Sequence, residues 1–210
     1  MTRSALRAND GLACVLLAAG GSRRLGRPKQ LLRHRGRPLV VLAAAAASRA
    51  LPRSPLIVVV GAEALRVRLA LRRARCNARV VTNVRWQEGM ATSLRAGLEA
   101  AGPNTEAALV LAVDQPLVGA AALTRLVAAW RRRPQVPAAA LYEGHAGVPA
   151  VLPRRRWRAL QSVRGDEGAR ALLRRSSALT LVDMPEAAFD VDTPDDVRRL
   201  APTRAERTSP

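Results

Sequence analysis

Short apolar runs alternate with helix-forming stretches along most of this chain, and this alternation is its most constraining feature. Residues 13–18 are apolar at every position, as expected for a parallel strand that is covered by helices on both faces. Further strands are predicted at residues 56–60, 78–82, 107–113, 138–142, 148–152 and 178–182. Helices are predicted at residues 38–50, 63–73, 91–101, 119–132, 154–161 and 167–174, and after Pro194. The pattern predicts a Rossmann-like three-layer αβα sandwich with a mostly parallel sheet and some antiparallel strands in the C-terminal half.

The length of 210 residues suits one domain with a substantial core. We expect a single domain over residues 12–200, a flexible N-terminus at 1–11 and a flexible tail at 201–210. No apolar run approaches the roughly 20 residues that a membrane helix needs, and residues 1–11 lack the apolar segment of a secretory signal. Two cysteines without metal-ligand spacing fit a reducing compartment. A cytoplasmic protein without a membrane partner is therefore predicted.

The formal net charge of +19 raises the possibility of a nucleic-acid partner. However, the arginines are spread along the whole chain, and five aromatic residues in total provide no platform for stacking single-stranded bases. We therefore expect no nucleic-acid partner. The charge instead favours the attraction of small anions.

The only lysine of the chain, Lys29, ends a glycine-rich stretch that follows the first predicted strand. The glycines would let backbone amides approach an anion closely, and cations surround that position: Arg23, Arg24, Arg27 and Lys29. The stretch is neither a Walker P-loop nor a G-x-G-x-x-G motif. From these residues alone, a phosphate-binding loop and a flexible loop with solvated arginines are both open.

Acidic residues follow two other predicted strands. Asp114 comes directly after the strand at 107–113, where a carboxylate can hold Mg²⁺ together with phosphate oxygens, although an aspartate before a proline also commonly opens a turn. Asp190 and Asp192 precede a helix that Thr193 or Asp192 can cap. Asp190 and Asp192 are therefore candidates to meet Asp114 across a metal ion.

Several motifs together resemble the MobA-like nucleotidyltransferases, and among these the molybdenum-cofactor cytidylyltransferases. The first motif runs from Leu17 to Leu32 as Leu-Ala-Ala-Gly-x-Ser-x-Arg-x-Gly-x-Pro-Lys-x-Leu-Leu. The later ones are Asn83-x-x-Trp86-x-x-Gly89-Met90-x-x-Ser93-Leu94, Asp114-Gln115-Pro116, Gly147-x-Pro149, Gly165-Asp166-x-Gly168-Ala169-Arg170 and Asp190-x-Asp192-Thr193-Pro194. The resemblance covers nearly all of residues 12–200.

This resemblance implies the sugar-nucleotide transferase type of fold and a Mg²⁺-dependent transfer of CMP from CTP to the terminal phosphate of molybdopterin, with release of pyrophosphate. Arg24, Lys29 and Asp114 would be the catalytic residues, and Asp114 and Asp192 would bind the metal. The nucleotide would contact Leu17, Ala18, Ala19, Gly20, Gly21, Ser22, Gly26, Asn83, Gly89, Met90 and Ser93. Ala19 favours CTP, because similar proteins that use GTP tend to have glycine there. A molybdenum hydroxylase, or the chaperone that matures it, would be a protein partner.

One departure from the resemblance bears on the acceptor substrate. Gly147-Val148-Pro149 stands where the cytidylyltransferases often have Gly-His-Pro, and the nearby histidine is His145. Transfer to a sugar or alcohol phosphate, the use of GTP, and a non-catalytic protein that binds a nucleotide or cofactor all stay open as alternatives.

Overall fold

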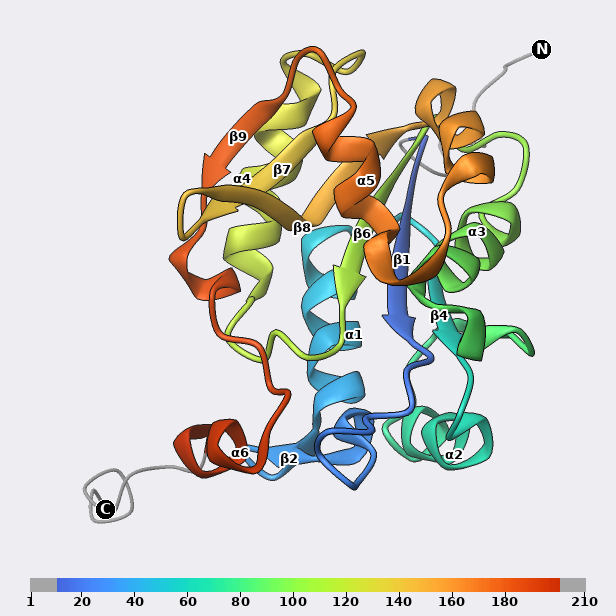
Figure 1. Ribbon diagram of the computed structural model, residues 1–210, viewed down its shortest axis with the longest axis vertical. Helices are drawn as coiled ribbons and strands as arrows, with labels where there is room; N and C mark the ends of the chain where they lie inside the picture. The colour runs from blue at the N-terminus through green and yellow to red at the C-terminus, as the bar shows by residue number, and fades with distance from the viewer. Residues whose placement is uncertain (1–10, 201–210) are drawn as a thin grey trace, which may run out of the picture.

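A computed structural model describes residues 11–200, which form a sheet between two helical layers (Figure 1). The seven strands of the sheet lie in the order β5-β4-β1-β6-β8-β7-β9. They are β1 (Leu12–Ala18), β4 (Leu56–Val60), β5 (Arg79–Thr82), β6 (Ala107–Ala112), β7 (Ala138–Tyr142), β8 (His145–Pro153) and β9 (Thr180–Asp183). Strand β8 pairs antiparallel with both of its neighbours, and the other pairings are parallel. The predicted fold class is confirmed.

Strand β1 shows why the sheet is covered on both faces. Its seven residues are all buried, and because side chains alternate across a strand, Cys14 and Leu16 join one apolar cluster while Val15 and Leu17 join the other. The first cluster includes buried residues of α1 (Leu39–Ala50), α2 (Ala64–Arg73) and α4 (Ala120–Arg131). The second includes residues of α3 (Met90–Ala100) and α5 (Gly168–Arg174). In Figure 1, α3 and α5 lie in front of the sheet and α1 behind it.

Helix α3 packs very close to the sheet because it carries a glycine at the contact. A Cβ atom on Gly97 would lie 2.4 Å from Cγ1 of Val15 and 3.0 Å from Cγ2 of Val59. No larger side chain fits between the helix and strands β1 and β4 without a shift of the backbone.

The structure differs from the sequence prediction in its short elements. The stretch predicted as a helix at 154–161 is a 3-10 segment, η3 (Arg154–Ser162), in which only Leu160 is buried, so no apolar stripe supports a regular α-helix there. A short hairpin and several 3-10 turns were not predicted: β2 (Arg33–His34), β3 (Arg37–Pro38), η1 (Lys29–Leu31), η2 (Trp86–Glu88), η4 (Gly165–Glu167) and η5 (Pro185–Ala187). Residues 1–10 of the N-terminus expected to be flexible at 1–11, and the tail expected to be flexible at 201–210, lie outside the described residues.

The neighbouring strands β1 and β6 define where a crevice opens. From β1 the sheet continues to β4 and β5 on one side and to β6 and the later strands on the other. Loops that leave two adjacent parallel strands in opposite directions leave a crevice at the carboxyl ends of those strands. Among the described residues, no helix is long and apolar enough to span a bilayer.

Candidate active site

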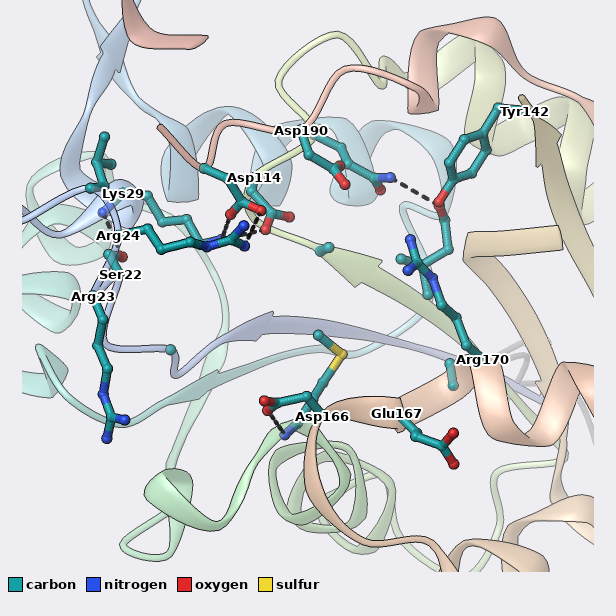
Figure 2. A pocket seen from close by; sticks show the side chains of 18 residues that line it. Ser22, Arg23, Arg24, Lys29, Asp114, Tyr142, Asp166, Glu167, Arg170 and Asp190 are labelled. Carbon is teal, nitrogen blue, oxygen red and sulfur yellow. Dashed lines mark hydrogen bonds and ion pairs between the residues drawn. The ribbon is translucent and has the colours of Figure 1, made fainter. Parts of the chain in front are cut away.

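A cleft of about 450 Å³ opens at the carboxyl ends of β1 and β6 (Figure 2). A second hollow of about 270 Å³ adjoins it and shares Gly20, Lys29 and Asp114 with it. Loops from distant parts of the chain contribute to the walls: the loop after β1, the loop after β6, the segment around η4 and α5, and the loop before α6 (Pro194–Leu200). This is the crevice that the strand order predicts.

The loop after β1 is held in place by short contacts to its own backbone. The hydroxyl of Ser22, which has a φ of 51°, accepts a hydrogen bond from the backbone N–H of Lys29 at 3.0 Å. The side-chain amide of Gln30 is buried and donates to the carbonyls of Ala18 at 3.0 Å and Gly20 at 2.7 Å. These hydrogen bonds give the loop a defined shape.

Lys29 lies between two carboxylates from different loops. Its Nζ is 2.5 Å from Oδ2 of Asp114 and 2.9 Å from Oδ1 of Asp192. Arg24 pairs with the other oxygen of Asp192 at 2.6 Å. Figure 2 shows Lys29, Arg24 and Asp114 on one wall of the cleft. Cations and acids that lie far apart in the sequence are thus brought together, as the motifs predicted.

The carboxylates are positioned by the backbone around them. The N–H of Val191 donates to the carbonyl of Asp114 at 2.9 Å and so ties the loop before α6 to the end of β6. Asp196 accepts hydrogen bonds from the N–H groups of Asp192 at 3.1 Å and Thr193 at 2.8 Å. The hydroxyl of Thr193 accepts one from the N–H of Asp196 at 3.3 Å, which is the reciprocal arrangement of a helix cap. The predicted capping role of Thr193 is confirmed.

The electrostatics of the cluster follow from burial and from the opposed charges. Burial alone would lower the pKa of Lys29, but the adjacent Asp114 and Asp192 raise it above its ordinary value. Burial opposes the ionised form of Asp192, yet Lys29 and Arg24 hold its pKa below the ordinary value. Burial, followed by repulsion from Asp114 and Asp192, raises the pKa of Asp190 to about 6. Asp190 thus differs from Asp192, because no side-chain cation pairs with it directly within residues 11–200.

The adjoining hollow has a flat aromatic wall. Trp86 packs on Gly21, where a Cβ would lie 2.8 Å from the indole ring. Gly89, with a φ of 104°, contacts the backbone of Gly165, because a Cβ there would lie 2.3 Å from the carbonyl carbon. The contact between the start of α3 and η4 that this permits is reinforced by Asp166, which accepts a hydrogen bond from the N–H of Met90 at 3.3 Å. The hollow is therefore closed on one side by two glycine contacts.

The carboxylates of the cleft are the side chains there that could bind a divalent cation. Within residues 11–200, no three His, Cys, Asp or Glu side chains converge closely enough to hold a metal ion unaided. Asp114 and Asp192 nevertheless already hold one cation between them, the ammonium of Lys29. Two hard carboxylates that leave the remaining positions to water and phosphate oxygens are a donor set that suits Mg²⁺.

A comparison with known protein families matches residues 14–185 to the MobA-like NTP transferase domain. The chain belongs to this family. The observed strand order is consistent with this family. The chain is therefore a nucleotidyltransferase of the MobA-like family. The resemblance found in the sequence motifs is confirmed.

Individual relatives are similar over nearly the whole chain. Nicotine blue oxidoreductase of Paenarthrobacter nicotinovorans is 37% identical over an alignment of 201 positions, which covers 89% of this chain and 94% of that protein. The crystal structure of Rv0371c from Mycobacterium tuberculosis H37Rv has a TM-score of 0.76 and 32% identity, and the match covers 90% of this chain and 96% of that one. A complex of Rv0371c with manganese has a TM-score of 0.73 and 30% identity, covering 90% and 97%.

The structure of this MobA-like chain brings most of the predicted site residues to the cleft. Lining either the cleft or the hollow are Leu17, Ala19, Gly20, Gly21, Ser22, Arg24, Lys29, Gly89, Met90, Ser93, Asp114 and Asp192. Three predicted residues line neither the cleft nor the hollow: Ala18, Gly26 and Asn83. Ala18 is buried at the end of β1, and Gly26 adopts a φ of 69° in the turn of the loop. Asn83 is buried and donates to the hydroxyls of Thr92 at 2.8 Å and Ser93 at 2.9 Å, which anchors the first turn of α3.

Other residues of the cleft were not among the predicted site residues. The far side of the cleft, as we name the wall formed by Tyr142, Val148, Ala169 and Arg170, joins the β7–β8 hairpin to α5. The Gly165–Arg170 motif was part of the resemblance without an assigned role, so it was the available signal for Arg170. Tyr142 carried no signal, because it reads as an ordinary strand residue. His145 is exposed and packs edge-on against Tyr142 at 4.9 Å between ring centroids.

Proposed function

We propose that this protein transfers a CMP group from CTP to the terminal phosphate of molybdopterin and releases pyrophosphate. The observation that carries the proposal is the contact of Lys29 with Asp114 and Asp192 at 2.5 and 2.9 Å. Through this contact, the cationic loop after β1 lies against two carboxylates in the crevice of a nucleotidyltransferase fold. Phosphate oxygens would replace the carboxylates as partners of Lys29 and Arg24 when a triphosphate enters.

In the proposed reaction, a phosphate oxygen of the acceptor attacks the α-phosphorus of the nucleotide. The bond from that phosphorus to the bridging oxygen breaks, and pyrophosphate leaves with the electron pair. Lys29 and Arg24 would stabilise the negative charge that develops on the leaving group. No side chain acts as a nucleophile, so the chain contributes binding, orientation and charge stabilisation.

Asp114 and Asp192 would hold Mg²⁺, which would neutralise phosphate charge when bound. The manganese complex of Rv0371c supports a divalent ion for this family. In this chain, the ammonium of Lys29 already lies between these two carboxylates, which supports a metal site at Asp114 and Asp192.

The choice of CTP rests on the nucleotide side of the site. Ala19 is buried and lines the hollow beside Trp86. Its methyl group narrows that hollow relative to a glycine, which favours a pyrimidine over a purine.

A pyrophosphate-release assay tests the function. The purified protein is supplied with Mg²⁺, molybdenum-loaded molybdopterin and each of the four nucleoside triphosphates in turn. Release with CTP alone supports the proposal, and release with GTP alone assigns a different base. Turnover with a sugar or alcohol phosphate but not with molybdopterin moves the function to another acceptor. Nucleotide binding without any turnover identifies a non-catalytic binding protein.

A second candidate function is the reduction of nicotine blue. It is favoured by the name of the relative with 37% identity, nicotine blue oxidoreductase. Oxidation of NADH or NADPH, followed at 340 nm with nicotine blue as the acceptor, tests it directly. Oxidation of the nicotinamide that depends on nicotine blue, together with no pyrophosphate release in the first assay, would support the reductase function.

A further inference from the structure

The far side of the cleft has a charge pattern that the nucleotide does not explain. The described cations that line the cleft are Arg23, Arg24, Lys29 and Arg170. The first three belong to the loop after β1. Arg170 alone projects from α5 on the opposite wall, and Figure 2 shows it extending into the cleft toward Tyr142.

Arg170 is exposed and has no hydrogen bond or ion pair within the described part of the chain. Its positive charge nevertheless acts on the carboxylates, since it counteracts the raised pKa of Asp190. An unpaired guanidinium that points into a cleft is available to bind an anion, and its planar donors fit phosphate oxygens in pairs.

A second, independent feature lies beside it. Tyr142 is 5% exposed, and its hydroxyl has no hydrogen-bond partner within residues 11–200. The ring reaches this position because residue 147 is glycine, where a Cβ would lie 2.2 Å from the Tyr142 hydroxyl. A buried hydroxyl without a partner costs about 1–3 kcal/mol, so a ligand oxygen at this wall would satisfy it.

The geometry of phosphoryl transfer indicates from which side the acceptor must approach, and so which substrate Arg170 and Tyr142 would face. Attacking and leaving oxygens lie roughly in line across the phosphorus. If the leaving pyrophosphate lies over Lys29 and Arg24, the attacking oxygen approaches from the opposite wall. A doubly charged phosphate on that path would face Asp114 and Asp190, and a cation is needed to offset their repulsion.

We propose that the far side of the cleft is a subsite for a phosphate monoester carried on a flat or apolar group, with Arg170 pairing with the phosphate and the Tyr142 hydroxyl donating a hydrogen bond to an adjacent phosphate oxygen. The proposal rests on the proposed nucleotidyl transfer, because it assigns this subsite to the acceptor. Val148 and Ala169 supply the apolar surface for the group that carries the phosphate.

Binding of phenyl phosphate tests the subsite without turnover. A non-hydrolysable α,β-methylene analogue of CTP, with Mg²⁺, first fills the nucleotide side. Calorimetric titration of phenyl phosphate then compares the wild type with Arg170→Gln, Arg170→Lys and Arg175→Gln. Arg175 follows α5 directly, is exposed, does not line the cleft and hydrogen-bonds Ser162 instead, so its variant removes the same charge outside the cleft.

The expected result is at least about tenfold weaker binding by Arg170→Gln, a loss of one charge-assisted phosphate contact. Arg170→Lys should recover part of it, and Arg175→Gln should bind as the wild type does. The subsite is overturned if the wild type does not bind phenyl phosphate, if Arg170→Gln binds it normally, or if Arg175→Gln loses as much. Equal binding of phenol would also overturn it, because phosphate would then not be recognised.

Failure of the proposed function is distinguishable from failure of the subsite. If the nucleotide analogue does not bind, nucleotidyl transfer fails, and phenyl phosphate is titrated into Arg170→Gln and Lys29→Ala without it. A loss in Arg170→Gln then still supports an anion site on the far side. A loss in Lys29→Ala alone overturns it.

Discussion

At the scale of single residues, the lone lysine lies where carboxylates from two loops converge. Its ammonium contacts both Asp114 and Asp192, at 2.5 and 2.9 Å. A guanidinium is planar and carries its donors in a fixed fork, so it would have to contact the two carboxylates in a different geometry. The other 34 of the 35 basic residues are arginines, so the composition does not favour lysine here. We therefore infer that this position favours a compact cation.

Replacement of Lys29 is therefore expected to impair nucleotide use even when the charge is kept. Lys29→Ala and Lys29→Arg should each lower kcat/KM for the nucleotide by at least about tenfold, the scale of one charge-assisted contact. Steady-state kinetics with the accepted triphosphate measure this. Arg27→Ala is the matched control, because Arg27 is exposed in the same loop and does not line the cleft. Full activity of Lys29→Arg would show that the shape of the cation is irrelevant.

Asp114→Asn is expected to lower kcat by at least about a hundredfold, as the loss of a principal electrostatic group does. The amide is almost the same size as the carboxylate, so circular dichroism and Tm should show an intact fold. Asp183→Asn, an exposed residue at the end of β9, should keep wild-type turnover. Near-normal kcat in Asp114→Asn would remove Asp114 from the catalytic residues.

Asp190 should make stability depend on pH in a defined window. Its pKa is raised from 3.8 to about 6 in the folded chain, so the folded state keeps a proton that the unfolded state has lost. The free energy of unfolding therefore falls as pH rises from about 4 to about 6 and is level for this group above that. Asp190→Asn should remove this decline, so urea unfolding should show it more stable than the wild type at pH 8 and equal at pH 4. Parallel pH profiles for the two proteins would contradict the assignment.

At the scale of elements, periodicity was sufficient for the sheet and its main helices. The strands at 56–60 and 138–142 match β4 and β7 residue for residue, because every buried position of a central strand must be apolar. Periodicity was not sufficient for η3, whose arginines and tryptophan mimic a helix while only Leu160 is buried. The loop cations and the acids of the site were predictable from their places after strands. Tyr142 was not, because only tertiary packing brings the β7–β8 hairpin beside α5. Arg170 stood in a motif of the resemblance to which the sequence assigned no role.

The close packing of α3 gives a prediction for an element as a whole. Gly97→Ala would place a methyl group 2.4 Å from Cγ1 of Val15, and such overpacking costs about 1–3 kcal/mol. Urea unfolding should show this loss of stability. Gly119→Ala is the control, because nothing lies within 4 Å of the added Cβ, and it should change stability by less than about 1 kcal/mol. Equal stabilities of the two variants would mean that α3 moves away from the sheet without strain.

At the scale of the molecule, the net charge of +19 should affect encounter with anionic substrates more than chemistry. Raising NaCl from about 0.05 to about 0.5 M should increase KM for the nucleotide several-fold with kcat nearly unchanged, because screening shortens the range of attraction. Initial rates at fixed Mg²⁺ measure this. An uncharged viscogen at matched osmolarity serves as the control, and a fall in kcat alone would contradict the expectation.

The single reversed strand of the sheet has a consequence for how such a molecule can diversify. Because β8 runs against its neighbours, it is joined to β7 by a turn of two residues, Glu143 and Gly144, both with positive φ. That turn lies at the same end of the sheet as the cleft, next to Tyr142, whereas Lys29 and Asp114 belong to other connections. Insertions in this tight hairpin could therefore reshape one wall while the ion cluster keeps its geometry. The part of the site that holds the ion cluster is thus structurally independent of the part that the hairpin forms.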